Sequence, residues 1–331
     1  MSPRALLVTV LALLGATSCD RTIPDAPPTA RLQPGAAERR FALVVGNNRG
    51  SALRTALRYA ERDAARVARV LTELGHFATR DVYLHQGHSA GDLRARLGDL
   101  RRTIARAKAD SPATRALVVL YFSGHSDGVA LELGNDRLPF ADLRSLLGAT
   151  GADVRIGLLD TCRSGAAIGL KGGALVDGYD LSVTTLPALS GEAFLSASRS
   201  DEVALEARDI EASLFSMHLV SGLRGAADAD VDGVVTLDEL YRHTSVRTSG
   251  AAAETLYGTQ TPAYDYRLIG QGQLVLSYVA ESRHHLFLPP GFDRIVVSDA
   301  RGEPQAEVRL GSTARLAVAP GIYRARGLRD G

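Results

Sequence analysis

Short apolar runs alternate with longer amphipathic stretches between residues 40 and 250. The apolar runs predict buried strands over residues 40–48, 81–86, 113–128 and 154–160. Leu, Val and Ala at helical spacing predict helices over residues 51–75, 90–109 and 141–148. Strands that are apolar on both faces and alternate with helices are typical of a mostly parallel sheet flanked by helices. The pattern therefore predicts an α/β fold.

The pattern continues to about residue 271 and then changes. Further strands are predicted over residues 191–198 and 202–207, and closing helices over residues 213–226 and 236–246. We assign residues 40–271 to this domain. Short β segments separated by turn residues then predict a small all-β module over residues 272–331. A strand is only just completed at Gly331, which favours a module that continues beyond this residue.

Composition and charge narrow the class of protein. The 331 residues are 45% hydrophobic and 23% charged, which is ordinary for a folded globular protein. Lys and Arg (38) nearly balance Asp and Glu (37), Trp is absent, and aromatic residues make up only 5%. Neither a basic surface nor stacking side chains are indicated. We expect no nucleic-acid partner.

The N-terminal segment has the features of an export signal. Arg4 precedes the apolar stretch "ALLVTVLALLGA", which is too short to span a bilayer. Small residues before Cys19 resemble a bacterial lipoprotein signal over residues 1–18, and this resemblance implies a lipidated Cys19 with a tether over residues 19–39. The protein would then be membrane-anchored at the periplasmic face or the cell surface. A plain secretory signal, with Cys19 incidental, is the alternative.

Two chemically active side chains follow neighbouring apolar runs. Cys162 comes directly after the strand that ends near Asp160, and His125 comes directly after the strand that ends near Ser123. Because ligands bind at the carboxyl edge of such sheets, both are candidate site residues. A histidine within hydrogen-bond reach raises the thiolate fraction of a cysteine. The alternatives are an inert buried cysteine and a histidine that is simply a hydrogen-bonded polar residue of a turn.

Backbone groups at this edge also carry candidate chemistry. The N–H groups around Gly124 and Ser126, and that of Cys162, are candidate donors to an oxyanion, since turns at a strand end often present such groups.

The segments "FALVVGNN…AERDA", "LVVLYFSGHSDG" and "GLLDTCRSG" resemble the caspase-like cysteine peptidases, in particular the metacaspase and bacterial orthocaspase branch. The resemblance covers roughly residues 40 to 265 and implies a caspase-like fold. It also implies that His125 is the base and Cys162 the nucleophile. Two positions depart from the pattern of many metacaspases, namely Ser126 after the histidine and Arg163 after the cysteine.

The same resemblance implies a specificity. In the metacaspase branch a pocket for a basic P1 side chain is built at the positions that match Asp63, Ser123 and Asp160. Carboxylates suit a buried Arg or Lys side chain. The implied partner is a protein or peptide cleaved after Arg or Lys. For Asp63, an exposed charge on a helix is the alternative.

A second motif lies between the two closing helices. The stretch "DADVDGVVTLDE" fits the twelve-residue calcium-loop pattern, with Gly233 at the sharp turn. The ligand positions are Asp228, Asp230, Asp232, Val234 through its carbonyl, Thr236 and Glu239. We expect Ca²⁺ here and no organic cofactor; a solvated acidic turn is the alternative.

The sequence thus favours an exported cysteine endopeptidase with basic specificity. Two other functions stay open. One is a catalytically inactive caspase-fold binding or scaffold protein at the cell envelope. The other is acyl transfer or amide hydrolysis on a cell-wall substrate, since the Cys and His chemistry is shared.

Overall fold

A mixed six-stranded sheet forms the centre of the molecule. The computed structural model describes residues 6–8, 38–162, 189–199, 202, 204–255, 258–270, 272–309 and 314–329. The strands are β2 (Glu38–Gly46), β3 (Val82–Gln86), β4 (Arg115–Ser123), β8 (Val154–Asp160), β9 (Ser190–Ser196) and β13 (Ala263–Ile269). Their order is β13-β9-β8-β4-β2-β3, and only β13 runs antiparallel to its neighbour. The predicted mostly parallel sheet is confirmed.

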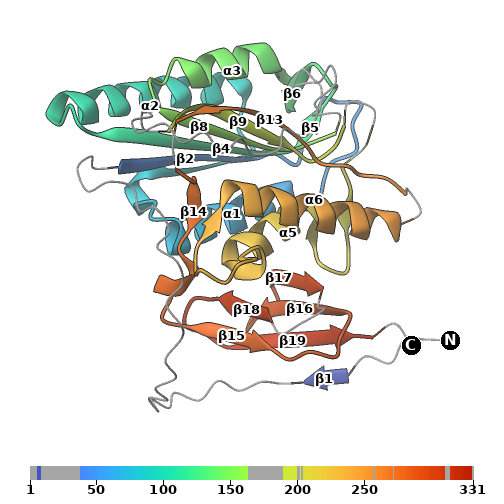
Figure 1. Cartoon of the computed structure of the whole chain (residues 1–331). Helices are drawn as coiled ribbons and strands as arrows, with labels where there is room; N and C mark the ends of the chain where they lie inside the picture. The colour runs from blue at the N-terminus through green and yellow to red at the C-terminus, as the bar shows by residue number, and fades with distance from the viewer. Residues whose placement is uncertain are drawn as a thin grey trace.

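Helices cover both faces of this sheet (Figure 1). One layer contains α2 (Ala90–Asp110) and α3 (Phe140–Gly148). The other contains α1 (Ala60–Leu74), α5 (Leu214–Ser221) and α6 (Leu237–Ala253). Strand β2 shows why its run is apolar throughout: Phe41 and Leu43 pack into the core under α2 and α3, whereas Val44 packs into the core under α1 and α5. Alternating side chains therefore face two dry interfaces.

Helix α1 begins nine residues later than predicted, since residues 51–59 form a loop. Leu53, which fits the helical spacing, is 98% exposed. The loop is held by contacts distant in sequence: Arg54 donates to the Glu132 carboxylate and to the Ser126 carbonyl. The helix end at Gly75 agrees with the prediction.

Smaller strands complete the domain. Strands β5 (His125–Ser126), β6 (Ala130–Leu133) and β7 (Asp136–Pro139) form one antiparallel sheet. The prediction that residues 202–207 extend the main sheet is wrong, because β10 (Glu206–Ala207) pairs only with β11 (Ala212–Ser213). The edge position is instead taken by β13, which the sequence pattern did not predict.

The C-terminal β segments pack below the α5 layer (Figure 1). They are β15 (His285–Leu288), β16 (Arg294–Asp299), β17 (Pro304–Arg309), β18 (Ala314–Ala317) and β19 (Tyr323–Leu328), with a hydrophobic core of their own. The Glu307 N–H donates to the Ser221 hydroxyl at 2.8 Å, which joins the module to α5. The segment over residues 273–279 does not pair within the module: its strand β14 (Val275–Ser277) pairs with β12 (Val235–Thr236).

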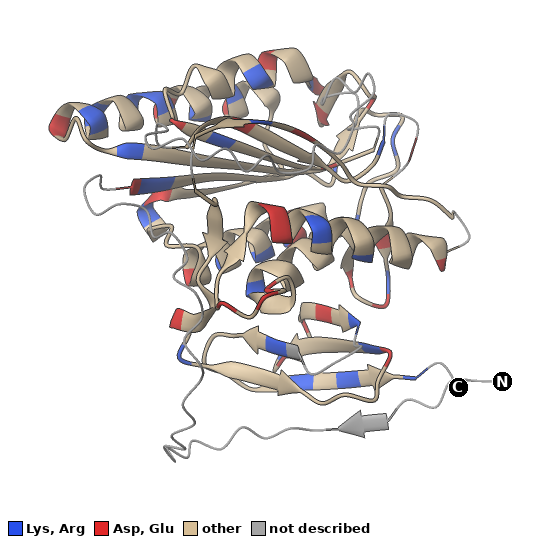
Figure 2. Cartoon of the chain, in the orientation of Figure 1, with Lys and Arg blue, Asp and Glu red and all other residues tan. Residues whose placement is uncertain are grey.

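The N-terminal predictions fall mainly on undescribed residues. Leu6–Val8 form β1, which pairs with β19. Cys19 and the tether up to residue 37 lie outside the described residues, and the last two residues of the predicted tether, Glu38 and Arg39, begin β2. Among the described residues, no helix is both long and apolar enough to cross a membrane. Basic and acidic residues are interspersed over the described helices and strands (Figure 2).

Candidate active site

The carboxyl ends of β4 and β8 bring the predicted catalytic residues together. The two strands are parallel neighbours, with Ser123 opposite Asp160. His125 and Cys162 each follow two residues later, on the same edge of the sheet. A narrow cavity of about 20 Å³ is lined there by Leu57, Ser123, Gly124, His125, Asp160, Cys162, Ala204, Leu205, Glu206 and Ser213. Four of the five predicted catalytic and pocket residues therefore share one cavity.

The orientation of His125 is set by the loop before α1. Its Nε2 lies 3.0 Å from the backbone carbonyl of Thr55. A carbonyl only accepts hydrogen bonds, so Nε2 must carry the proton and Nδ1 of the neutral ring is the acceptor. Burial lowers the pKa of His125, and the nearby Arg54 lowers it further, while the Thr55 carbonyl and the Glu132 carboxylate oppose this shift. The ring is therefore a neutral base at neutral pH.

The same loop brings further groups to the histidine. Gly50 packs so closely that a Cβ there would lie 2.8 Å from Cδ2 of His125. Arg54 pairs with Glu132, whose side chain is buried beside it. Sequence reasoning missed Thr55 and Arg54 because both were assigned to the predicted helix, and no local motif marks either residue.

Cys162 is partly exposed and its backbone is anchored. Its carbonyl accepts a hydrogen bond from the Ser126 hydroxyl. The pKa of Arg54 is raised, first by its hydrogen bond to Glu132, and a thiolate at Cys162 would add to this rise. Arg54 is therefore close enough to interact with a charge on Cys162.

One of the three candidate oxyanion donors is already occupied. The Gly124 N–H donates to the Asp160 carbonyl at 3.2 Å, which ties the end of β4 to the end of β8. This bond engages the Gly124 N–H within the sheet, which argues against this one group as an oxyanion donor. For the N–H groups around Ser126 and that of Cys162, the role of oxyanion donor stays a prediction.

Asp160 lies at the base of the cavity and is held by hydroxyl groups. Its carboxylate accepts hydrogen bonds from the Ser213 and Ser216 hydroxyls. Burial raises the pKa of Asp160 to about 6; the two serines oppose the rise, and the charge of Glu206 adds to it. A cation in the cavity would favour the ionised form of Asp160.

Asp63 is placed differently from the other pocket residues. It is 1% exposed, so the alternative of an exposed helix charge is wrong, and it does not line the cavity. Its carboxylate pairs with the Arg66 guanidinium at 2.7 Å and accepts the backbone N–H of Ser213 at 3.0 Å. Burial raises the pKa of Asp63, and Arg66 opposes that rise. Asp63 therefore contacts the cavity wall through Ser213.

The predicted calcium loop brings its first three aspartates together. One oxygen each of Asp228, Asp230 and Asp232 lies within 4.8 Å of the others. Gly233 has a positive φ of 86° at the sixth position, which a side chain rarely adopts. The Glu239 carboxylate accepts hydrogen bonds from the N–H and the hydroxyl of Thr236. These bonds form part of the capping box at the start of α6.

These oxygens fit a hard cation. Oδ1 of Asp228 is buried and has no hydrogen-bond partner. Burial raises the pKa of Asp228 to about 6, and the charges of Asp232, Glu239 and Asp230 add to the rise. A calcium ion would supply the missing partner and offset the repulsion between carboxylates.

Comparison with known proteins identifies the family. The model of the caspase domain family matches residues 39–270, more than half of the chain. No curated protein matches the chain. Two similar solved structures are caspase-1 from Spodoptera frugiperda (13% identity, TM-score 0.49, covering 78% of this chain and 99% of that chain) and pro-sf-caspase-1 (12% identity, TM-score 0.47, 79% and 98%). The family model, together with the sheet described above, confirms the predicted caspase-like fold.

Proposed function

This chain belongs to the caspase family, and on that premise we propose that it is a cysteine endopeptidase that cleaves protein substrates after Arg or Lys. Cys162 is the nucleophile and His125 the base. The observation that carries the proposal is the hydrogen bond between Nε2 of His125 and the Thr55 carbonyl, beside Cys162. This hydrogen bond leaves Nδ1 of His125 as the proton acceptor, at the same sheet edge as the Cys162 thiol.

The chemistry follows from this arrangement. Nδ1 of His125 takes the thiol proton, and the Cys162 thiolate adds to the scissile carbonyl carbon. The C–N bond then breaks as the imidazolium gives its proton to the leaving amine, which leaves a thioester on Cys162. Water, deprotonated by His125, hydrolyses the thioester and restores the thiol.

Two carboxylates support a preference for basic residues. Asp160 and Glu206 both line the cavity, and the charge of Glu206 raises the pKa of Asp160, so the two are electrostatically coupled. A guanidinium or ammonium group between them would relieve this repulsion. A cavity of about 20 Å³ holds no more than a water molecule, so it must widen before an arginine side chain can enter.

Peptide cleavage tests the proposal directly. Fluorogenic peptides that differ only in Arg, Lys or Asp at P1 would be incubated with the purified chain, with and without calcium, beside Cys162→Ala and His125→Ala variants. We expect turnover after Arg and Lys that both variants lose. No turnover under any condition, together with a Cys162 thiol that does not react with an alkylating agent, would instead support a binding or scaffold protein.

A second comparison tests specificity apart from catalysis. Glu206→Gln keeps the size of the side chain and removes its charge. We expect a larger drop in kcat/KM for Arg than for Gln at P1. Equal losses for both peptides would contradict an acidic pocket. Cleavage of cell-wall amides without any basic preference would support acyl transfer or amide hydrolysis on a cell-wall substrate.

We also propose that the protein is exported and anchored through a lipidated Cys19, so that the active site faces the periplasm or the cell exterior. The support is the apolar stretch after Arg4 and the small residues before Cys19. Mass spectrometry of the membrane fraction would detect the lipidated N-terminal peptide, and Cys19→Ala would release the protein from the membrane. Retention of that variant in the membrane fraction would contradict the anchor.

A further inference from the structure

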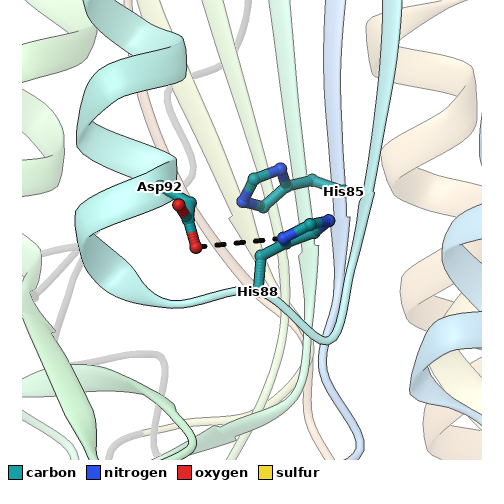
Figure 3. Close-up of side chains that lie close together, drawn as sticks. All are labelled: His85, His88 and Asp92. Carbon is teal, nitrogen blue, oxygen red and sulfur yellow. Dashed lines mark ion pairs between the residues drawn. The ribbon is translucent and has the colours of Figure 1, made fainter.

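A cluster of two histidines and an aspartate lies at the turn between β3 and α2. His85 is near the end of β3, His88 is in the turn, and Asp92 is in the first turn of α2. One ring nitrogen of each histidine and one carboxylate oxygen of Asp92 lie within 4.8 Å of one another. Figure 3 shows both rings with a nitrogen on the side of the Asp92 carboxylate. None of these residues belongs to the candidate active site.

His85 is the part of the cluster that needs a partner. It is only 6% exposed, and its buried Nε2 has no hydrogen-bond partner. Buried polar atoms are normally bonded, since leaving one unsatisfied costs roughly 1–3 kcal/mol.

The backbone of His88 and the carboxylate of Asp92 are held by neighbouring groups. The ring of His88 stacks on that of His85, with centroids 4.2 Å apart. Its carbonyl accepts a hydrogen bond from the Asn47 side chain at 3.0 Å. Asp92 accepts hydrogen bonds from the backbone N–H of Ser89 at 3.0 Å and from its hydroxyl at 2.7 Å. Such outer contacts orient ligands before a metal binds.

We propose that His85, His88 and Asp92 bind a divalent transition-metal ion, for which zinc is the best-fitting probe. Two imidazoles and one carboxylate are a ligand set typical of zinc sites with an open position. Donors around tetrahedral zinc lie about 3.3 Å apart, given bonds of about 2.0–2.1 Å. The present separations reach up to 4.8 Å, so the His88 ring, which is exposed, would have to rotate for its nitrogen to reach that spacing.

One of the three proposed ligands, His88, lines a cavity. A cavity of about 310 Å³ lies beside the cluster, and its walls include His88 and Ser89 from the β3–α2 turn and Asn47 and Arg49 from the loop after β2. Water or a small anionic ligand would reach the metal from there. Nitrogen donors argue against calcium, which takes oxygen ligands.

Zinc titration calorimetry tests the site. The full chain would carry Cys162→Ala, because a cysteine thiolate is itself a good zinc ligand, and calcium would be present to fill the acidic loop. We expect one zinc per chain and a rise in the melting temperature on binding. His85→Gln and His88→Ala should each weaken binding by at least about tenfold. His76→Ala removes an exposed histidine that pairs with Glu281, and should leave binding unchanged.

The outcomes decide the proposal. No zinc binding, or equal affinity in the parent protein and in His88→Ala, overturns it. Because His88 is exposed, that variant decides the matter even where circular dichroism shows that His85→Gln does not fold. Cobalt gives an independent readout: visible d–d absorption bands that disappear in His88→Ala support the site, and bands that persist contradict it.

Discussion

The backbone carbonyl of Thr55 accepts a hydrogen bond from Nε2 of His125 at 3.0 Å. Because a main-chain oxygen makes this contact, the position of the loop before α1, and not the identity of one side chain, sets the tautomer and direction of the imidazole. The position of the candidate base therefore depends on the position of that loop. This relationship leads to the first two predictions.

Gly50→Ala should lower kcat/KM by about tenfold to a hundredfold with KM little changed. A Cβ at this position would lie 2.8 Å from Cδ2 of His125 and 2.9 Å from both the Arg54 side chain and Glu132, so either the histidine or the loop that orients it has to move. Steady-state kinetics on the peptide substrate measures the effect. Gly148→Ala is the matched control, because its Cβ would meet nothing within 4 Å. A Gly50→Ala enzyme as active as this control would contradict the account.

The pKa of His125 should respond in opposite directions to its two charged neighbours. Arg54 lowers this pKa and Glu132 raises it. Arg54→Gln should therefore raise the pKa, so that the neutral base is lost at a higher pH, and Glu132→Gln should lower it. NMR titration of the imidazole in a Cys162→Ala background measures the shift without interference from the thiol. Shifts of the same sign in both variants would contradict the prediction.

Asp160→Asn should stabilise the fold while it weakens cleavage after Arg. The folded-state pKa of about 6 lies above the value of 3.8 for an unperturbed aspartate, so the unfolded state loses its proton first. The unfolding free energy of the wild type should therefore fall as the pH rises from about 4 to 6, by about 3 kcal/mol in total. Asp160→Asn removes this part of the slope.

Denaturant unfolding at several pH values, for the wild type and Asp160→Asn, measures that slope. Asp142→Asn provides a control at a carboxylate in the first turn of α3, outside the cavity. Identical slopes for the wild type and Asp160→Asn would show that the buried carboxylate is not the origin of the pH dependence.

Calcium should stabilise the wild type and not Asp228→Asn. At a concentration one hundred times the Kd, a ligand that binds only the folded state adds about 2.7 kcal/mol of stability. In EDTA, Asp228→Asn should instead have a higher melting temperature than the wild type, because the substitution relieves repulsion between the crowded carboxylates. Thermal melts in calcium and in EDTA test both arms.

The control for calcium is Asp238→Asn, which changes an exposed aspartate that pairs with Arg242 outside the ligand positions. It should keep the full response to calcium. An equal calcium response in Asp228→Asn would identify the loop as a solvated acidic turn.

The sequence by itself determined the layered sheet and the edge that carries the catalytic candidates. Runs such as Ile156–Leu159 are apolar on both faces because helices cover both sides of the sheet, and this requirement is visible in a few consecutive residues. His125 and Cys162 come directly after two such runs in the sequence. The capping box that begins α6 and the alternating aspartates of the acidic loop are local patterns as well.

Tertiary structure decided the rest, because the partners are far apart in the chain. The loop over residues 51–59 has helical spacing, yet its contacts with Glu132 and Ser126 hold it over His125. The contact of Glu206 with the start of α1 likewise spans about 150 residues. Hydrophobic periodicity records which face of an element is buried. It does not record which distant polar group satisfies a carbonyl, a carboxylate or an imidazole, and those pairings place Thr55 beside His125 and leave Nε2 of His85 without a partner.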